Sequence, residues 1–417
     1  MRRRQFLQHS GAFVALGASA AVPAEGLLPE LRADASTRLD KLIGREMAAR
    51  HIPGLSACLV HKDGHILWSR NFGYANLASK EKMSFDHVQN IASISKTFTS
   101  VAAMQQVEAG LLNLDADVND YLPFNLEHPE YRDQIITPRM LMRHVSGLRD
   151  GSVYARHYAC GDPRMSLGVW IKEYFEQDGA FYNADENFAP WAPGDQYEYC
   201  NVSFGLLGHL VEITSGLSLP DYCERNIFTP LGMSRTRWMI ADIDSAKTTT
   251  PYSWVEEHVA RGPSWGGVPL GVISAAGPTL TAELPNAYNA NCTYNHPNYP
   301  DGFLRTSVAQ IAVWAQTWLG DGEINGIRLL GADHTMQMFT DDSAVSGSDN
   351  RQGLTWYSNQ EINGERLWGH SGSDPGVSTS LLMARESGIA AIVFTNTNGA
   401  TPTDFTKEIL KEGLHAI

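Results

Sequence analysis

The chain has little positive charge and, outside its first residues, no long hydrophobic run. Its 417 residues include 32 Lys and Arg against 46 Asp and Glu, which gives a formal net charge of −14 at pH 7. An acidic chain is repelled by nucleic-acid phosphates and by anionic lipids. We therefore expect no nucleic acid among its partners and no stable membrane span in the mature protein.

The sequence also lacks several motifs that carry catalytic chemistry. It contains no Gly-x-Ser-x-Gly nucleophile elbow, no His-Glu-x-x-His zinc motif, no P-loop and no dinucleotide-type Gly-x-Gly-x-x-Gly. The run from Asp115 resembles the start of a calcium loop, but Asp120 and Leu126 stand where such a loop needs Gly and Glu. We therefore expect neither a metal nor a cofactor.

Cysteine is scarce. The five cysteines form no Cys-x-x-Cys pair and no cluster with metal-ligand spacing; they are Cys58, Cys160, Cys200, Cys223 and Cys292. This is too few for a disulfide scaffold, so the favoured interpretation is that they are small buried hydrophobic residues. An odd number leaves at least one free thiol in an exported chain unless two chains pair.

The first 24 residues have the pattern of a signal peptide. Arg2, Arg3 and Arg4 precede an uncharged stretch rich in Ala and Gly at 10–22, which ends in small residues. Its apolar part, about 13 residues, is shorter than the roughly 20 that a membrane-spanning helix needs. The Arg-Arg-x-Phe-Leu run resembles a twin-arginine export signal, so we expect a periplasmic or secreted bacterial protein. Removal of residues 1–24 would change the net charge to −17, because they contain three Arg and no acidic residue.

Strand-like and helix-like patterns are distributed unevenly along the chain. Strand-like runs joined by turn signals predict strands near both ends, at 55–60, 66–72, 353–357, 366–368, 377–384 and 388–395. Helical periodicity dominates the middle, near 95–109, 138–143, 203–214, 219–227 and 307–319. Two more helices are expected at 33–51 and after Pro402.

This distribution predicts an α+β fold (an α/β sandwich) with a mostly antiparallel five-stranded sheet flanked by helices. The sheet would come from about 53–75 and 350–397, with a mainly helical subdomain, about 81–345, inserted between them. The two terminal helices would cover one face of the sheet. Residues 33–417 then form a single domain, although the length alone favours two or three.

Ser93-Ile94-Ser95-Lys96 opens one of the helical stretches. A Ser at a helix N-terminus lies at the positive end of the helix dipole, and a Lys three residues later lies one turn along the same face. A desolvated Lys can take the proton of a Ser hydroxyl and turn it into a nucleophile. Ser79 and Lys82 have the same spacing but lie in a charged stretch, where a lysine would be solvated. The context therefore favours Ser93 and Lys96.

Two further short motifs follow in order along the chain. Tyr199-Cys200-Asn201 precedes a helix, and residues two apart in an extended segment face the same way, so a phenol and an amide can share one cleft. His370-Ser371-Gly372 lies between two predicted strands, where a strand edge can bind an extended substrate and Gly permits close approach. Other Tyr-x-Asn matches, at 74–76 and 357–359, are interpreted as structural.

The ordered set Ser-x-x-Lys, Tyr-x-Asn and His-x-Gly resembles the serine β-lactamase-like family, which contains class C β-lactamases, D,D-peptidases, D-aminopeptidases and related esterases. Other similar stretches run from about residue 40 to the C-terminus. They include 299–304 and the run from His144 to Leu148, which we interpret as holding a loop near the site.

The resemblance implies a serine hydrolase that forms an acyl-enzyme on Ser93 and hydrolyses an amide, ester or β-lactam bond of a small-molecule or peptide substrate. Lys96 and Tyr199 would share the general-base and proton-shuttle work. The backbone N–H groups of Ser93 and Ser373 would bind the oxyanion. The residues that would position the substrate are Asn201, His370, Ser371 and Gly372.

The chain departs from the family pattern at two positions. His370 replaces the Lys usual in true β-lactamases, and a neutral His would weaken a clamp for a substrate carboxylate. Cys200 replaces a small Ser and should point away from the cleft. Two alternatives remain: a catalytically silent relative that binds cell-wall peptides or a partner protein, and a hydrolase that uses one of the cysteines.

Overall fold

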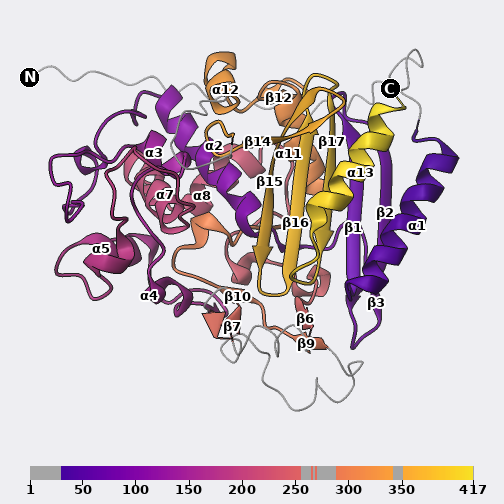
Figure 1. Cartoon of the computed structure of the whole chain (residues 1–417), viewed down its shortest axis with the longest axis horizontal. Coiled ribbons are helices and arrows are strands. Elements are labelled where there is room, and N and C mark those ends of the chain that lie inside the picture. The colour runs from indigo at the N-terminus through magenta and orange to yellow at the C-terminus, as the bar shows by residue number, and fades with distance from the viewer. Residues whose placement is uncertain (1–29, 255–263, 266–267, 270–287, 341–350, 417) are drawn as a thin grey trace, which may run out of the picture.

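The structure, a computed structural model, describes residues 30–254, 264–265, 268–269, 288–340 and 351–416 (Figure 1). The predicted signal peptide at 1–24 lies outside these ranges. The helices are α1 (Ala33–Ala49), α2 (Ser95–Glu108), α3 (Pro138–Met142), α4 (Ser152–Ala155), α5 (Leu167–Phe175), α6 (Ala184–Asn187), α7 (Val202–Ser215), α8 (Leu219–Cys223), α11 (Val308–Leu319), α12 (Ala332–Met338) and α13 (Pro402–Leu414), together with the short turns η1 (Ala92–Ile94), η2 (Val118–Asp120), η3 (Glu224–Phe228), η4 (Ile240–Asp242), η5 (Ser245–Lys247) and η6 (Tyr299–Asp301).

The strands are short in the middle of the chain and long at its two ends. They are β1 (Gly54–His61), β2 (Ile66–Asn76), β3 (Glu81–Lys82), β4 (Gln89–Asn90), β5 (Ala159–Cys160), β6 (Tyr252–Trp254), β7 (Ser264–Trp265), β8 (Val268–Pro269), β9 (Tyr288–Ala290), β10 (Tyr294–Asn295), β11 (Arg305–Thr306), β12 (Glu323–Ile324), β13 (Ile327–Arg328), β14 (Tyr357–Ile362), β15 (Glu365–Asp374), β16 (Val377–Ala384) and β17 (Ile389–Thr395).

One antiparallel sheet contains strands from both ends of the chain, in the order β14-β15-β16-β17-β1-β2-β3. The two ends meet where β1 pairs with β17, from Leu55 opposite Thr395 to His61 opposite Ile389. The predicted α+β architecture, with one sheet built from both ends, is confirmed. The predicted five strands form the centre, and β14 and β3 extend the sheet by one short strand at each edge.

The strand predicted at 353–357 was wrong in its position. Leu354 and Trp356 are buried, and their apolar pattern suggested a strand. In the structure the backbone N–H of Leu354 donates to the carbonyl of Met338, so this segment packs onto the helical part of the molecule. The edge strand β14 begins only at Tyr357.

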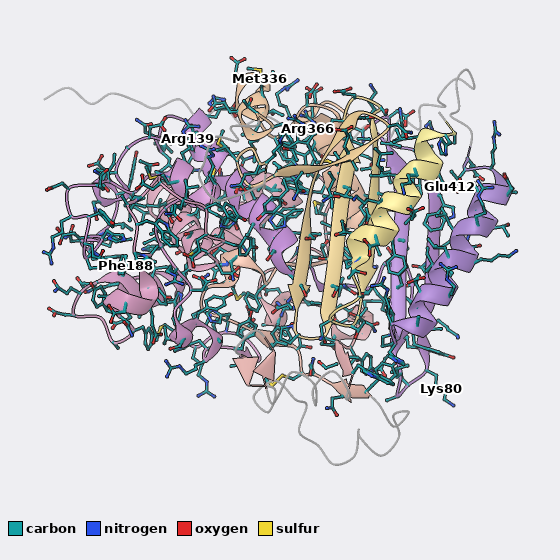
Figure 2. All side chains as sticks on the ribbon, viewed as in Figure 1. Lys80, Arg139, Phe188, Met336, Arg366 and Glu412 are labelled. Carbon is teal, nitrogen blue, oxygen red and sulfur yellow. A yellow bond between two sulfur atoms is a disulfide. The ribbon has the colours of Figure 1, made fainter. Side chains whose placement is uncertain are left out.

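The terminal helices α1 and α13 cover one face of the sheet, as predicted (Figure 1). Leu39 and Ile43 on α1 pack with Leu55 and Leu59, which are alternate residues of β1 and therefore point to the same face. Arg38 on α1 and Glu412 on α13 form an ion pair at 2.7 Å, and Figure 2 shows Glu412 between the two helices.

The opposite face of the sheet packs against the helical part of the chain. Cys58 and Val60, the other alternate residues of β1, belong to the large core that contains α2, α7 and α11. Phe98 on α2 stacks on Trp314 of α11 with ring centroids 3.8 Å apart. Almost every side chain of α2 is buried, so the helix that follows Ser93 is held from several sides.

No single helix in the described part of the chain is both long and apolar enough to cross a bilayer. The segments Val202–Ser215 and Leu219–Phe228 would meet the length and composition criteria only if taken together, and they are bent by 73° relative to one another.

Two of the five cysteines are not buried thiols, which corrects the expectation from the sequence. Cys160 and Cys292 form a disulfide bond that links β5 to the segment before β10, the strand with which β5 pairs. The pairing escaped prediction because the two residues are 132 positions apart and only the fold brings them together. Cys58, Cys200 and Cys223 are free and buried, as expected.

Loss of the disulfide should destabilise the protein, because a cross-link over 132 residues restricts the unfolded chain. We expect the Cys160→Ser, Cys292→Ser double variant to lose roughly 2–5 kcal/mol of unfolding free energy in urea denaturation. Wild-type protein in excess reductant is the matched control and should approach the variant. Equal stability of oxidised and reduced wild-type protein would contradict the expectation.

Candidate active site

Ser93 lies in the turn η1, directly before α2. Ala92 before it adopts a positive φ of 47°, a conformation that costs a non-glycine residue about 1–3 kcal/mol and persists only where neighbours enforce it. Here the side-chain oxygen of Asn90 accepts a hydrogen bond from the backbone N–H of Ala92 at 2.8 Å. Asn90 is itself fixed in β4, opposite Arg305 of β11. The turn therefore presents Ser93 in one defined orientation.

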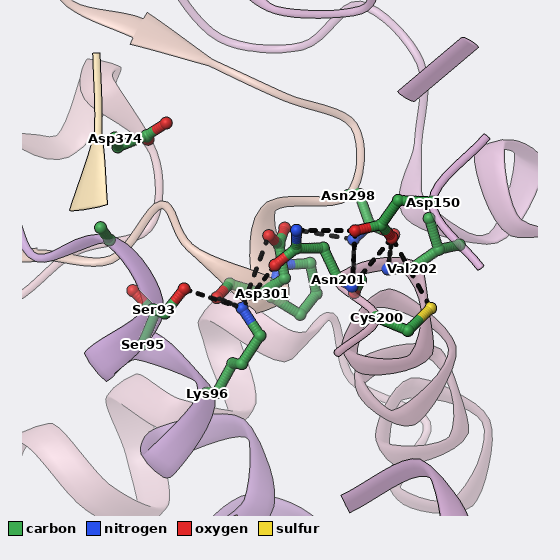
Figure 3. A network of polar contacts seen from close by, with 12 residues as sticks. Ser93, Ser95, Lys96, Asp150, Cys200, Asn201, Val202, Asn298, Asp301 and Asp374 are labelled. Carbon is green, nitrogen blue, oxygen red and sulfur yellow. Dashed lines mark hydrogen bonds and ion pairs between the residues drawn. The ribbon is translucent and has the colours of Figure 1, made fainter. Parts of the chain in front are cut away.

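The hydroxyl of Ser93 receives two hydrogen bonds from the other two predicted catalytic residues. The phenol of Tyr199 donates to Ser93 Oγ at 2.7 Å, and Lys96 Nζ donates to the same atom at 3.1 Å. Figure 3 shows Lys96 one turn along α2 from Ser93, as its spacing predicted. The structure therefore brings these three side chains together.

Lys96 is a fully buried cation with a complete set of acceptors. Besides Ser93 it donates to the side-chain oxygen of Asn201 and to the backbone carbonyl of Asp301, both at 2.7 Å (Figure 3). Burial works to lower the pKa of Lys96, but Tyr199 and the Asp301 carboxylate, 3.8 Å away, raise it overall. Burial also raises the pKa of Tyr199, although the Lys96 charge offsets part of this effect. The resting pair is an ammonium beside a phenol.

Asp150, which the sequence analysis did not single out, fixes the start of α7. Its carboxylate accepts hydrogen bonds from the backbone N–H groups of Asn201 and Val202 and from the Asn201 side-chain amide, at 2.8–2.9 Å. An acidic side chain at a helix N-terminus is stabilised by the free N–H groups and by the dipole. Asp150 thereby aims the Asn201 oxygen at Lys96. A single Asp fifty residues upstream carries no local sequence signal for this role.

His144 holds Tyr199 from the other side. Its ring accepts a hydrogen bond from the backbone N–H of Cys200 at 3.1 Å and packs against the Tyr199 ring, with centroids 4.2 Å apart. This geometry fits the loop-holding role predicted for the run that begins at His144. Cys200 itself is buried, and its Sγ lies 3.6 Å from Asp150 Oδ1.

The free thiols have the opposite chemistry to that of a cysteine nucleophile. A reactive cysteine needs a lowered pKa and access to substrate. Burial raises the pKa of Cys58, Cys200 and Cys223. These environments do not favour a cysteine hydrolase.

The predicted His-Ser-Gly segment lies on β15, beside the nucleophile turn. The pairing of β15 with β14 ends at Gly369 opposite Tyr357, so among the described residues no strand covers that edge of β15 from His370 to Asp374. Along this stretch Ser371 and Ser373 are exposed, whereas His370, Gly372 and Asp374 are buried.

Gly372 permits β15 to lie directly on the nucleophile turn. A Cβ atom at this position would come within 2.4 Å of the Ile91 carbonyl oxygen and 2.9 Å of the Ala92 Cβ. Gly205 on α7 also permits a close approach, because a Cβ there would overlap the side chain of Asn298.

A Gly372→Ala substitution should separate β15 from the turn that carries Ser93. We expect a loss of roughly 2–4 kcal/mol of unfolding free energy, typical of overpacking or an induced backbone shift, together with loss of most activity. Gly44→Ala on the exposed side of α1 is the matched control, because a Cβ there meets nothing within 4 Å. Similar stabilities for the two variants would show that β15 does not pack tightly on the turn.

His370 is buried and uncharged. Burial and the nearby Lys96 charge lower the pKa of His370 to about 3, and its Nδ1 lies 2.6 Å from the Ser371 carbonyl oxygen. Its Nε2 is buried without a hydrogen-bond partner in the described part of the chain. The direction of this shift is the one for which we expected a weaker clamp for a substrate carboxylate than a lysine would provide.

The lowered pKa has a consequence for stability. In the unfolded chain this His binds a proton below about pH 6.5, whereas folded His370 does not bind one until about pH 3. Protonation therefore favours the unfolded state, so the contribution of neutral His370 to the unfolding free energy is complete above pH 6.5 and is lost as the pH falls. Wild-type protein should lose up to about 1.4 kcal/mol more per pH unit below 6.5 than His370→Gln. Urea unfolding of both proteins between pH 7.5 and 5 measures this difference. Parallel curves would contradict it.

Ser93 opens into a cavity of about 210 Å³. The cavity is lined by Tyr199 and Asn201, by Ser373 and Asp374 at the end of β15, and by residues that the sequence analysis did not assign to the site, namely Tyr154, Tyr158 and Asp301. The Tyr154 phenol donates to Asp301 at 2.7 Å and the Tyr158 phenol donates to Asp374 at 3.0 Å. Only tertiary contacts reveal these pairs.

The other matches to Ser-x-x-Lys, at 79–82, and to Tyr-x-Asn, at 74–76 and 357–359, do not line the cavity at Ser93. Ser79 and Lys80 are exposed, and Figure 2 shows Lys80 at the rim of the molecule. Lys82 packs over the ring of Tyr74 at 3.8 Å. Tyr357 is hydrogen-bonded to the Tyr197 hydroxyl at 3.1 Å.

The antiparallel sheet and its inserted helical part form the fold of β-lactamase-related and penicillin-binding-protein-like serine hydrolases. The family model described as Beta-lactamase matches residues 39–413, and the chain therefore belongs to the Beta-lactamase family.

Individual relatives are distant. The chain is 24% identical over 372 residues to Protein flp of Staphylococcus aureus strain N315; the match covers 88% of this chain but only 64% of that protein's length. It is 24% identical to Penicillin-binding protein 4* of Bacillus subtilis strain 168, covering 86% of this chain and 71% of the relative. The D-amino acid amidase of Ochrobactrum anthropi SV3 has a similar fold, with a TM-score of 0.69, 20% identity and coverage of 92% and 99% of the two chains.

Proposed function

We propose that this protein is an exported serine hydrolase that forms an acyl-enzyme on Ser93 and hydrolyses an amide, ester or β-lactam bond. The observation that carries the proposal is the Ser93 hydroxyl held at 2.7 Å from the Tyr199 phenol and 3.1 Å from Lys96 Nζ, at the wall of a cavity. Hydrogen-bond distances of this size suit proton transfer from a nucleophile.

In the proposed reaction Ser93 Oγ forms a bond to the substrate carbonyl carbon. Its proton passes to the Lys96–Tyr199 pair, which must first have lost one proton, because an ammonium beside a phenol has no site for another. The pair then protonates the leaving nitrogen or oxygen as its bond to the carbonyl carbon breaks. Water attacks the acyl-enzyme, releases a carboxylic acid and restores Ser93.

We assign substrate positioning to Asn201 and to the uncovered edge of β15, which includes Ser371 and Gly372. The oxyanion site is assigned to the backbone N–H groups of Ser93 and Ser373, since both residues border the cavity. The structurally similar amidase and the penicillin-binding protein make an acyl-transfer reaction the natural expectation.

Export is part of the same proposal. The N-terminal Arg-Arg-x-Phe-Leu run supports a twin-arginine signal. The disulfide between Cys160 and Cys292 suits an oxidising compartment such as the periplasm, where such bonds persist.

Ser93→Ala should reduce hydrolysis by a factor of about 10⁴ or more and abolish labelling by a fluorophosphonate probe. The substrates are nitrocefin, p-nitrophenyl esters and amino-acid amides, and mass spectrometry locates the adduct. Ser79→Ala is the matched control, because Ser79 has the same Ser-x-x-Lys spacing but is exposed. Wild-type protein with neither an adduct nor hydrolysis would favour a catalytically silent binding protein, whereas Ser93→Ala with full hydrolytic activity would contradict Ser93 as the nucleophile.

A further inference from the structure

Among the described residues, the side chains that line the cavity at Ser93 include two acidic ones, Asp301 and Asp374, and no Lys, Arg or His. Lys96 is fully buried behind Ser93, with its hydrogen bonds directed to Ser93, Asn201 and Asp301. A substrate group entering the cavity therefore meets carboxylates.

The two carboxylates are in different situations. Asp301 is compensated, because its Oδ2 lies 3.8 Å from Lys96 Nζ. Asp374 receives hydrogen bonds from neutral groups among the described residues: the Tyr158 phenol at 3.0 Å, the Asn90 amide at 2.9 Å and the Tyr294 phenol. Within the described ranges no Lys, Arg or His nitrogen lies within 4.0 Å of the Asp374 carboxylate. Figure 3 shows Asp374 at the end of a strand, apart from the network around Lys96.

The buried Arg305 does not complete this site. Its guanidinium is directed to the backbone carbonyls of Phe303, Trp238 and Tyr294. It therefore contributes a nearby charge but no hydrogen bond to Asp374. A buried carboxylate without a cation is costly, and such groups are concentrated at functional sites. Burial raises the pKa of Asp374 to about 7. A bound cation would lower this pKa again, because it stabilises the charged carboxylate.

A metal ion is an unsuitable occupant for the described residues. No group of three or more His, Cys, Asp or Glu side chains among them could hold one. A substrate carboxylate is equally unsuitable, because His370 is neutral and the walls carry two carboxylates. The remaining cation of matching chemistry is an organic ammonium group.

We propose that Asp374 binds the free ammonium group of the acyl part of the substrate, so that the preferred substrates are amides or esters of amino acids or short peptides with an unblocked amino group. This inference rests on the acyl-enzyme function proposed for Ser93 and narrows it. The cavity, of about 210 Å³, places Asp374 and Ser93 on the walls of one space, as binding of both ends of such an acyl group requires.

The test compares phenylalanine p-nitroanilide with its N-acetylated form, using both enantiomers, on the full-length protein. Active sites are first counted with a fluorophosphonate probe. Wild-type enzyme should favour the free amine at least tenfold in kcat/KM, and Asp374→Asn should reduce that ratio to about 1, since a hydrogen bond to a charged group is worth roughly 10- to 100-fold. The exposed Asp115→Asn is the matched control and should keep the wild-type ratio.

A second measurement needs no variant. Phenylalanine amide should slow labelling of wild-type Ser93 by the probe at concentrations where N-acetylphenylalanine amide and N-acetylphenylalanine do not. Equal protection by the blocked compounds, or an unchanged substrate ratio in Asp374→Asn, would overturn the inference. Absence of any probe adduct on wild-type Ser93 would instead overturn the proposed acyl-enzyme function, so the two failures are distinguishable.

Discussion

The site is organised around one buried positive charge. Lys96 has no exposed surface, and a charge removed from water is tolerated only with a full set of partners. Those partners come from three distant parts of the chain, because Ser93 opens α2, Asn201 precedes α7 and Asp301 ends η6. The hydrogen bonds to this ammonium therefore hold the Ser93 hydroxyl, the Asn201 amide and Asp301 at one wall of the cavity in a fixed arrangement.

The sheet provides the frame in which this relation is held. Antiparallel pairing of β1 with β17 joins the two ends of the chain, and β15 then lies on the turn that carries Ser93. Gly372 makes the contact possible, because any Cβ would meet the backbone of the turn. The positive φ of Ala92 in this turn is supported by the hydrogen bond from its backbone N–H to Asn90. A strand from the C-terminal end and a turn from the N-terminal part thus form one reactive surface.

The proposed preference for a cationic substrate group depends on two residues of β15. His370, whose pKa burial lowers to about 3, stands where true β-lactamases usually have a lysine, and Asp374 lies four residues further along the same strand. The acidic composition led us to expect no nucleic acid among the partners, and in the cavity the acidic side chains are the basis of the proposal about the substrate.

The sequence by itself determined the local features. Helical periodicity selected Ser93 and Lys96 over the equally spaced Ser79 and Lys82, because only the first pair opens an apolar helix that can desolvate its lysine. Strand-like runs and turn signals identified the five central strands, and helical spacing of apolar residues identified the two covering helices. Local patterns succeed here because periodicity and turn chemistry act over a few residues.

Only the tertiary structure decided the rest. Asp150, Asp301 and Asp374 are single acidic residues without a local motif, and each acquires its role from a partner that lies far away in the sequence. The disulfide between Cys160 and Cys292 and the buried segment at 353–356 are of the same kind. Long-range pairing depends on which surfaces the fold brings together, and the order of neighbouring residues does not encode it.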